Sequence, residues 1–288
     1  MKNDADLVKN EYPPFSVAMS VYKNDNPEWF DVALKSVIEQ TVKPNEIVLV
    51  VDGPISDELR NIINKYENIC KNSNIYFNVI YLEQNQGHGI ARKTGLDNCS
   101  NKLVAIMDAD DICVLNRFET QLNVFNENPK VDVVGGIITE FIDSPDNIVG
   151  KRNVPLVDSE IKKYMKCRCP MNFVTVMFKK SSIEKVGGFI DWFCEEDYYL
   201  WIRMALAEMK FSNVDSTLVN VRVGKDMYKR RGGLRYFISE ARLQKYMRKK
   251  KVIGFSRYII NIAERFVVQV LMHNAIREWV FKTFARTK

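Results

Sequence analysis

The chain has 288 residues, of which 46% are hydrophobic and 27% are charged. This length and balance are typical of a globular protein with a sizeable core, and they exclude a disordered or fibrous chain. The charge is spread unevenly, because residues 225–288 hold 17 Lys and Arg against 4 Asp and Glu, whereas residues 1–224 hold 25 against 32. We therefore expect a main domain over residues 1–235 and a basic helical extension over residues 236–288.

The cysteines, histidines and apolar runs indicate which metal sites and which cellular compartment to expect. The six cysteines form no CxxC pair, and the only histidines are His88 and His273, which argues against a histidine-rich metal site. We see no signal peptide after Met1, and no run reaches the roughly 18 apolar residues that a membrane-spanning helix needs. We expect a cytoplasmic protein that does not cross a bilayer.

From residue 15 to about residue 140, β-rich runs alternate with helical stretches. This alternation predicts an α/β fold with a mostly parallel sheet covered by helices on both faces. The expected strands are Phe15–Val21, Glu46–Val51, Ile75–Leu82, Lys102–Met107 and Val131–Thr139. The expected helices are Pro27–Gln40, Ser56–Lys71, His88–Asn98, Asn116–Glu127 and, within a less regular stretch from 141 to 224, Glu195–Glu208.

Three carboxylates follow the fourth expected strand. Residues 106–111 read Ile-Met-Asp-Ala-Asp-Asp, so an apolar run leads directly into Asp108, Asp110 and Asp111. Clustered carboxylates repel one another unless a cation neutralises them, and hard oxygen ligands at a strand end suit Mg²⁺ or Mn²⁺ bridging a diphosphate. The alternative is that Asp110 or Asp111 caps the helix that begins near Leu115.

Two more acidic positions are candidates for chemistry. The second expected strand ends in Asp52-Gly53, where the carboxylate could accept a hydrogen bond from a base imide; the alternative is an Asp-Gly turn without a ligand. Residues 195–197, Glu-Glu-Asp, open a helix. One of them could be the general base that takes the proton of an attacking sugar hydroxyl. Alternatively, they could be there only because acidic side chains are stabilised at the positive end of the helix dipole.

Basic side chains near glycines are candidates for phosphate binding. The turn at residues 87–89 lacks the third glycine of a dinucleotide fingerprint, which disfavours an NAD enzyme. Arg92 and Lys93 follow it, and they could meet phosphate or form a solvated helix face. Arg230 and Arg231 stand beside a glycine pair and could clamp a diphosphate leaving group, or could belong to the basic surface.

Five stretches, taken together and in order, resemble the motifs of the family 2 glycosyltransferases, inverting enzymes with the GT-A fold. They are residues 16–22 with 36–41, 46–53, 85–92, 107–111, and 187–189 with 196–201. Among family members the chain is most similar to bacterial enzymes that build surface polysaccharide. The resemblance implies a GT-A fold and a transfer, with inversion, from a nucleotide-sugar to a lipid-linked saccharide in exopolysaccharide, capsule or O-antigen assembly. The default donor is a UDP-sugar.

Carried over residue by residue, the resemblance assigns the donor side of the site. Ser20 and Tyr22 would line the nucleotide pocket, and Asp52 would hold the base. Asp108 would lie near the ribose and diphosphate, and Asp110, with Asp108, would hold Mn²⁺ or Mg²⁺. Metal and arginine charge would stabilise the departing diphosphate.

The resemblance also implies a catalytic base, with departures from the family pattern. Asp197 would be the general base, and Glu196 and Glu195 stand beside it as the other carboxylates of the same motif. Many members carry an Asp where this chain has Val51, so one carboxylate is missing. Many also carry a His where this chain has Phe173, which removes a histidine from the acceptor or metal side.

The basic extension combines charge with an apolar stripe. Residues 248–251 read Arg-Lys-Lys-Lys and precede a stretch with apolar residues at helical spacing, at Phe255, Ile259, Ile262, Phe266 and Val270. This combination suits an anionic membrane surface, so we expect peripheral attachment at the cytoplasmic face, where a polyprenyl-linked acceptor is presented. The alternative is that the stripe packs on the catalytic domain or on a second subunit, which leaves a homo-oligomer open.

Two rival functions belong to other classes. A nucleotidyltransferase also carries acidic metal ligands beyond strands of an α/β sheet, but residues 20–24 lack its glycine-rich basic loop. A non-catalytic protein that binds nucleotides or nucleic acid through the basic extension would need no divalent metal and would bind more weakly as salt rises. We expect no nucleic-acid partner, because the acidic clusters argue for catalysis.

Overall fold

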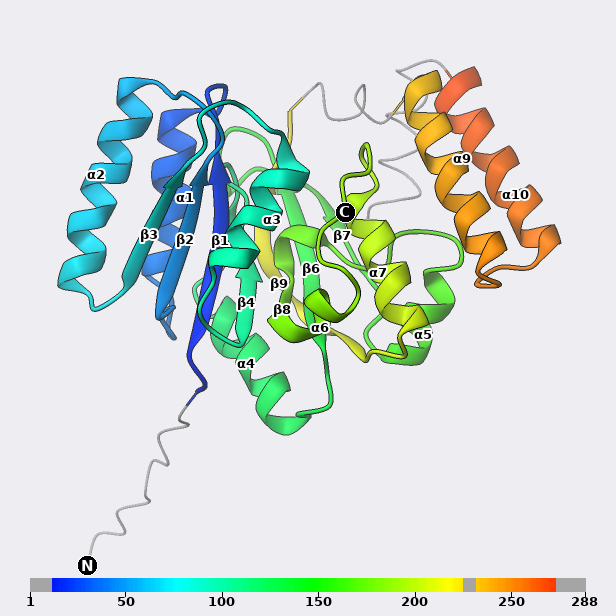
Figure 1. Cartoon of the computed structure of the whole chain (residues 1–288), viewed down its shortest axis with the longest axis horizontal. Helices are drawn as coiled ribbons and strands as arrows, with labels where there is room; N and C mark the ends of the chain where they lie inside the picture. Colours follow the sequence, from blue (N-terminus) through cyan, green and yellow to red (C-terminus); the bar gives the residue numbers. More distant parts are fainter. Residues whose placement is uncertain (1–11, 225–231, 273–288) are drawn as a thin grey trace, which may run out of the picture.

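The computed structural model describes residues 12–224 and 232–272. Their strands form one sheet with helices on both faces, and two C-terminal helices lie side by side at the end of the molecule away from α2 and β3 (Figure 1). The strands are β1 Phe15–Val21, β2 Glu46–Val51, β3 Tyr76–Tyr81, β4 Leu103–Ile106, β5 Ile112–Cys113, β6 Val133–Phe141, β7 Ile148–Arg152, β8 Met177–Lys179 and β9 Phe211–Arg222. The helices are α1 Pro27–Ile38, α2 Asp57–Asn72, α3 His88–Asn98, α4 Arg117–Glu127, α5 Asp158–Tyr164, α6 Lys180–Lys185, α7 Glu196–Leu206, α9 Leu234–Lys249 and α10 Phe255–Phe266.

The N-terminal half of the sheet confirms the sequence prediction. The strands run in the order β3-β2-β1-β4 and all pair in parallel. The bounds of β1, β2 and α3 are those expected. Each of these elements is a local run of residues that ends next to a polar residue or a glycine. β2 is buried along its whole length, as a parallel strand covered on both faces must be.

In the second half of the sheet only β6 was predicted, as a strand over Val131–Thr139, and the other strands were not. β8 lies between β4 and β6 and is antiparallel to both, while β9 is parallel to β6 and β5 is antiparallel to β9. β8 has only three residues, and β9 changes between buried and exposed positions around residues 213–217, so neither shows a sustained strand period. The pairing across the sheet, not the local sequence, makes these segments strands.

Each face of the sheet has its own apolar core. Phe30 and Leu34 of α1 pack with Leu59 of α2 on one face. On the other face Leu96 of α3 packs with Trp201 of α7. Burying one such side chain contributes about 1.5–3 kcal/mol. The two layers hold the strand ends rigid, which is what a precisely arranged site at those ends requires.

The helix α10 and the short helix that follows it, Val267–Leu271, turn their polar side inward. Asn261, Arg265 and Gln269 are buried, while Phe255 and Ile259 are 65% and 48% exposed. The expectation that α10 is amphipathic is confirmed, but its apolar stripe does not pack on the described part of the domain. The reason is a polar network beneath it: Asn261 donates to Gln244 Oε1 of α9 at 2.7 Å and to the Lys166 carbonyl at 2.9 Å.

The position of α9 bears on the boundary of the C-terminal extension, which the sequence predicts at residue 236. α9 begins at Leu234, and its Leu243 and Met247 are fully buried in the core cluster that contains Trp201. We propose that the extension begins with α9. Among the described residues, no helix is both long and apolar enough to cross a membrane.

Candidate active site

The parallel register brings the candidate residues to one edge of the sheet. Ser20 pairs with Val50 and Ala18 pairs with Ile106, so β1, β2 and β4 end at neighbouring points. In such sheets ligands bind beyond the carboxyl ends of the strands. The residues that follow these three strands, Tyr22, Asp52 and Asp108, therefore belong to the same edge.

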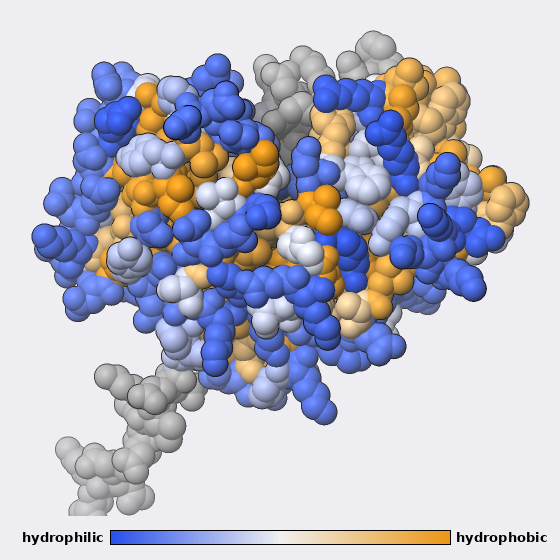
Figure 2. Space-filling model, viewed as in Figure 1, coloured by the Kyte–Doolittle hydropathy of each residue, from blue (hydrophilic) through white to orange (hydrophobic). Residues whose placement is uncertain are grey.

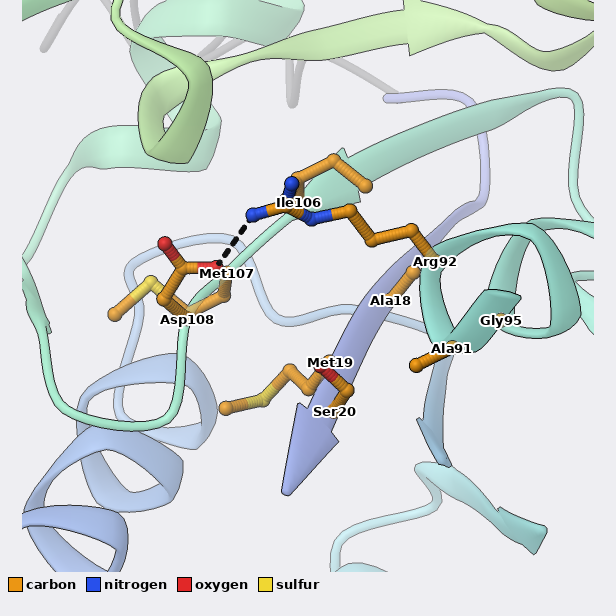
Figure 3. Close-up of a pocket in the computed structure, with 9 residues that line it drawn as sticks. All are labelled: Ala18, Met19, Ser20, Ala91, Arg92, Gly95, Ile106, Met107 and Asp108. Atoms are coloured by element: carbon orange, nitrogen blue, oxygen red, sulfur yellow. Dashed lines mark ion pairs between the residues drawn. The ribbon is translucent and has the colours of Figure 1, made fainter. Parts of the chain in front are cut away.

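A crevice opens at this edge between β1, β4 and α3 (Figure 3). Ser20 lies at the end of β1, and Arg92 reaches from α3 towards Asp108, with 3.7 Å between its Nη2 and the carboxylate Oδ1. Gly95 and Ala91 form the helix side of the crevice. The crevice unites a hydroxyl, a cation and a carboxylate that the sequence separates by up to 88 positions, from Ser20 to Asp108.

Asp52 is held by the loop that leads into α3. Its carboxylate is buried and accepts hydrogen bonds from the Gln86 and Gly87 amides at 2.6 and 3.0 Å and from Asn85 Nδ2 at 2.9 Å. A Cβ at Gly53 would lie 2.6 Å from the Asn85 nitrogen, so only glycine fits beside this loop. The Asp-Gly pair is thus more than a plain turn, because it anchors the loop at residues 85–87.

The three carboxylates after β4 have different surroundings. The Asp108 side chain is 40% exposed, whereas Asp111 is buried and accepts a hydrogen bond from the Arg222 amide at 2.8 Å. Burial raises the pKa of Asp111, and Asp110 and Asp108 raise it further. Neither Asp110 nor Asp111 caps α4, because the residue before that helix is Asn116, whose side chain makes no capping bond. The capping alternative is therefore wrong.

Sequence reasoning missed Asp25. Its carboxylate accepts a hydrogen bond from the Tyr22 amide at 2.9 Å, in the loop after β1. Burial raises the pKa of Asp25 to about 7; the Tyr22 hydrogen bond opposes the shift, and the charges of Asp110 and Asp108 add to it. Asp25 therefore shares the negative field of the carboxylates after β4. The signal available in the sequence was its place directly after a strand that ends at the site.

The carboxylate group fits a hard divalent cation. Asp25, Asp108 and Asp110 offer only oxygen donors, and the charges of Asp108 and Asp110 raise the pKa of Asp25. Mg²⁺ and Mn²⁺ prefer such donors and complete their shells with water and substrate phosphates. Among the residues that the structure describes, no group of three or more His, Cys, Asp or Glu side chains is placed to hold a metal ion by itself. Phosphate oxygens would therefore have to supply part of the coordination.

Arg92 connects the strand-end carboxylates with the start of α7. Its Nη1 lies 2.6 Å from Glu196 Oε1, and its guanidinium carbon is 4.2 Å from the centre of the Phe173 ring. The side chain is only 15% exposed, so the reading of Arg92 as a solvated helix face is wrong. Lys93 does have that role, since its side chain is 58% exposed and pairs with Asp97. Phe173 stands where many family members carry a histidine, and its ring provides the surface on which the Arg92 guanidinium stacks.

The three acids at the start of α7 point to different partners. Glu196 forms an ion pair with Arg92. Glu195 is buried, and its pKa is raised by burial, by Glu240 and by Asp197, so it lies against the polar network of the C-terminal helices. Asp197 has no ion pair among the described residues; the Cys169 thiol lies 3.7 Å from its Oδ2 and the Tyr198 amide 2.6 Å from its Oδ1. Asp197 is therefore the acid of the three best suited to take up a proton.

Two expected diphosphate contacts, Arg230 and Arg231, lie outside the described residues. The same holds for His273 and for the end of the basic extension.

The motifs and the geometry agree with the comparison to known proteins. Residues 16–187 match the model of glycosyl transferase family 2. The chain belongs to this family. Membership favours a glycosyltransferase over the nucleotidyltransferase and non-catalytic alternatives for this domain.

Two bacterial relatives of this family 2 glycosyltransferase align over nearly its whole length. An uncharacterized glycosyltransferase of Haemophilus influenzae is 35% identical over 94% of this chain and 99% of its own. An Escherichia coli UDP-Gal:alpha-D-GlcNAc-diphosphoundecaprenol beta-1,3-galactosyltransferase is 34% identical over 97% of this chain and 99% of its own. A third, an amylovoran biosynthesis glycosyltransferase of Erwinia amylovora, is 33% identical over 84% of this chain and 89% of its own.

Solved glycosyltransferases share the fold. A mannosyltransferase from Pyrobaculum calidifontis, in complex with GDP-Man and Mn²⁺, superposes with a TM-score of 0.62 over 91% of this chain and 71% of its own, at 17% identity. Residues 1–349 of Staphylococcus aureus TarS, in complex with UDP-GlcNAc, give 0.63 over 88% of this chain and 72% of that chain, also at 17% identity. The expected GT-A fold is confirmed.

Proposed function

We propose that this family 2 glycosyltransferase moves a sugar from a nucleotide-sugar, by default a UDP-sugar, to a lipid-linked saccharide in the assembly of a surface polysaccharide. The E. coli relative, which is named for a diphosphoundecaprenol-linked acceptor, supports this substrate class. The observation that carries the proposal is Arg92, which joins the carboxylates after β4 to the acidic start of α7. A donor diphosphate and an acceptor hydroxyl would meet across this bridge.

The donor side would use the strand-end residues. Ser20 and Tyr22 would line the nucleotide pocket, and Asp52 would hold the base through a lone pair that the loop at residues 85–87 does not use. Asp108 and Asp110 would hold Mn²⁺ or Mg²⁺. When bound, the ion would neutralise charge on the departing diphosphate.

On the acceptor side, Asp197 would act as the general base in a single displacement with inversion. The acceptor hydroxyl oxygen forms a bond to the anomeric carbon, its proton passes to Asp197, and the bond from that carbon to the diphosphate oxygen breaks. Cys169 would donate its S–H to the other carboxylate oxygen and so orient Asp197. Burial raises the pKa of the Cys169 thiol, and the Asp197 charge raises it further, which keeps this donor protonated.

Glu196 would position Arg92 and would not itself take the proton. Its carboxylate is within 2.6 Å of the guanidinium, and burial raises the pKa of Glu196 while Arg92 opposes that shift. Such a charge-assisted bond keeps the arginine aimed at the site.

The C-terminal helices would attach the enzyme to the cytoplasmic face of a membrane. The outward side of α10 and of the short helix after it carries Phe255, Ile259 and Leu271, which are 65%, 48% and 66% exposed. The exposed basic run at residues 248–251 precedes it directly. Figure 2 shows apolar surface gathered over this end of the molecule. Apolar side chains beside lysines and arginines suit an anionic lipid surface.

Calorimetric titration tests the donor side first. The protein is titrated with UDP, dTDP and GDP, each with Mn²⁺ and again with a chelator. Binding of one nucleotide that disappears with the chelator is expected, and it also names the donor class. If folded protein binds none of the three, the donor assignment of the strand-end residues is wrong.

A further inference from the structure

A second hollow lies between α9 and the loop that precedes α7. It has a volume of about 720 Å³ and is open to solvent. Trp192 and Phe193 form the loop side, and Leu234 and Ile238 form the apolar part of the helix side. A ligand pocket is typically about 300–1,000 Å³, so this hollow has room for more than a sugar.

The two walls are joined by specific contacts. Trp192 Nε1 donates to the Ser239 carbonyl at 3.4 Å, and the Ser239 hydroxyl donates to the Phe193 carbonyl at 2.6 Å. The Arg235 guanidinium carbon lies 4.1 Å from the centre of the Phe193 ring. These contacts hold the loop on α9, so the hollow is a built feature of the fold.

The end of the hollow at Asp191, which we call its inner end, belongs to the loop that leads into α7, the helix that carries the proposed catalytic base. The Glu195 amide donates to the Trp192 carbonyl at 3.0 Å, and the Trp192 and Tyr199 ring centres are 4.7 Å apart, so the loop is fastened to α7 on both sides of Asp197. On the α3 side, a Cβ at Gly89 would lie 3.2 Å from Asp191 Oδ1. The Asp191 carboxylate thus lies at the inner end, where it could accept hydrogen bonds from sugar hydroxyls.

The outer end of the hollow leads to the apolar side of the C-terminal helices. Leu234 and Ile238 are 60% and 41% exposed. The next residue, Phe237, packs edge-on against Phe266 of α10 at 5.4 Å between ring centres. An apolar chain leaving the hollow along Leu234 and Ile238 would therefore come next to the ring pair of Phe237 and Phe266.

The hollow also carries two arginines, Arg235 and Arg242. Arg242 is exposed and makes no ion pair with any residue that the structure describes. The Arg235 guanidinium is stacked on the ring of Phe193, which also lines the hollow. Two fork-shaped donors beside apolar walls match an anion that is attached to a hydrocarbon chain, and guanidinium groups bind phosphate oxygens in pairs.

We propose that this hollow binds the lipid-linked acceptor, with Arg235 and Arg242 on its diphosphate, the sugar directed towards Asp197, and the first isoprenoid units along Leu234 and Ile238. This inference rests on the proposed function and adds to it the place and the residues of acceptor binding. The three groups of the acceptor, a sugar, a diphosphate and a hydrocarbon, match the base at the start of α7, the arginines of α9 and the apolar side chains of α9.

Farnesyl diphosphate is the probe, at concentrations below its aggregation limit, with inorganic diphosphate and farnesol as its two halves. Titrations are made by calorimetry on the full chain with the cognate nucleotide and Mn²⁺ at saturation, so that the diphosphate cannot occupy the donor site. Wild type should bind farnesyl diphosphate at least tenfold more tightly than either half. Arg242→Ala should lose about tenfold of that affinity and leave farnesol binding unchanged.

Arg248→Ala is the matched control, because it removes the same charge from the last turn of α9 without lining the hollow. It should leave the affinity for farnesyl diphosphate unchanged. Equal losses in both variants, or equal affinities for farnesyl diphosphate and inorganic diphosphate, would overturn the inference. Nucleotide titration of the same samples separates this failure from failure of the proposed function, since Arg242→Ala should bind nucleotide as wild type does.

Discussion

Replacing Asp25 with asparagine should stabilise the protein above pH 7. The substitution keeps an oxygen that can accept from the Tyr22 amide, and it removes a charge that faces Asp108 and Asp110. In the wild type the pKa of Asp25 rises from 3.8 to about 7, chiefly through burial. Folding therefore takes up a proton at this carboxyl between these two values. The associated stability is fully present below pH 3.8 and is lost as the pH rises through 7.

The size of the effect follows from the shift. About three pKa units correspond to at most about 4 kcal/mol, at 1.36 kcal/mol per unit. Asp25 is only partly buried, and screening by solvent reduces the value, so we expect about 1–2 kcal/mol. The gain of Asp25→Asn should be near zero at pH 4, grow up to pH 7 and stay constant above it.

Urea unfolding at pH 5 and pH 8 without divalent metal measures this difference. Asp215→Asn is the control, since Asp215 is an exposed residue of β9 and its replacement should change the free energy of unfolding by no more than about 0.5 kcal/mol at either pH. A gain for Asp25→Asn that is equal at both pH values, or a loss at pH 8, would refute the reasoning, because burial and like charge would then not govern this carboxyl.

Three further outcomes are expected. Asp197→Asn should lower sugar transfer by at least about 10²-fold while calorimetry shows nucleotide affinity changed by less than about twofold; near-normal turnover would move the base to another carboxylate. Asp110→Asn should weaken nucleotide binding in Mn²⁺ by about tenfold or more and leave binding with chelator unchanged. Phe255→Glu combined with Ile259→Glu should abolish sedimentation with vesicles that contain anionic phospholipid, at unchanged melting temperature. Ile148→Glu, an equally exposed apolar site on β7, should sediment as wild type does, and equal behaviour of the two proteins would contradict the membrane assignment.

The local sequence was sufficient for the strands that end at the site. β1, β2 and β4 are short runs rich in apolar residues. Asp52 comes directly after β2, and Asp108 comes two residues after the end of β4. A strand that is buried on both faces has no choice of face, so its run length alone predicts it. The family motifs follow from the same local order, and for that reason the family could be identified from the sequence.

Other parts of the site depend on contacts between residues distant in the chain. Asp25 became a candidate only because the loop after β1 folds towards Asp108, and Arg92 and Glu196 are 104 positions apart. No periodicity encodes such a pair, because it arises where α3 and α7 pack on the same face of the sheet.

The C-terminal helices show the division most clearly. The sequence predicts the amphipathic spacing from Phe255 to Val270. Spacing alone does not show whether such an apolar stripe packs in a core or lies on a membrane. The tertiary structure decided the direction: Asn261, Arg265 and Gln269 face inward because Gln244, Glu240 and main-chain carbonyls satisfy their hydrogen bonds there. Sequence determines which side of a helix is apolar, but which side is buried depends on the partners that the rest of the fold provides.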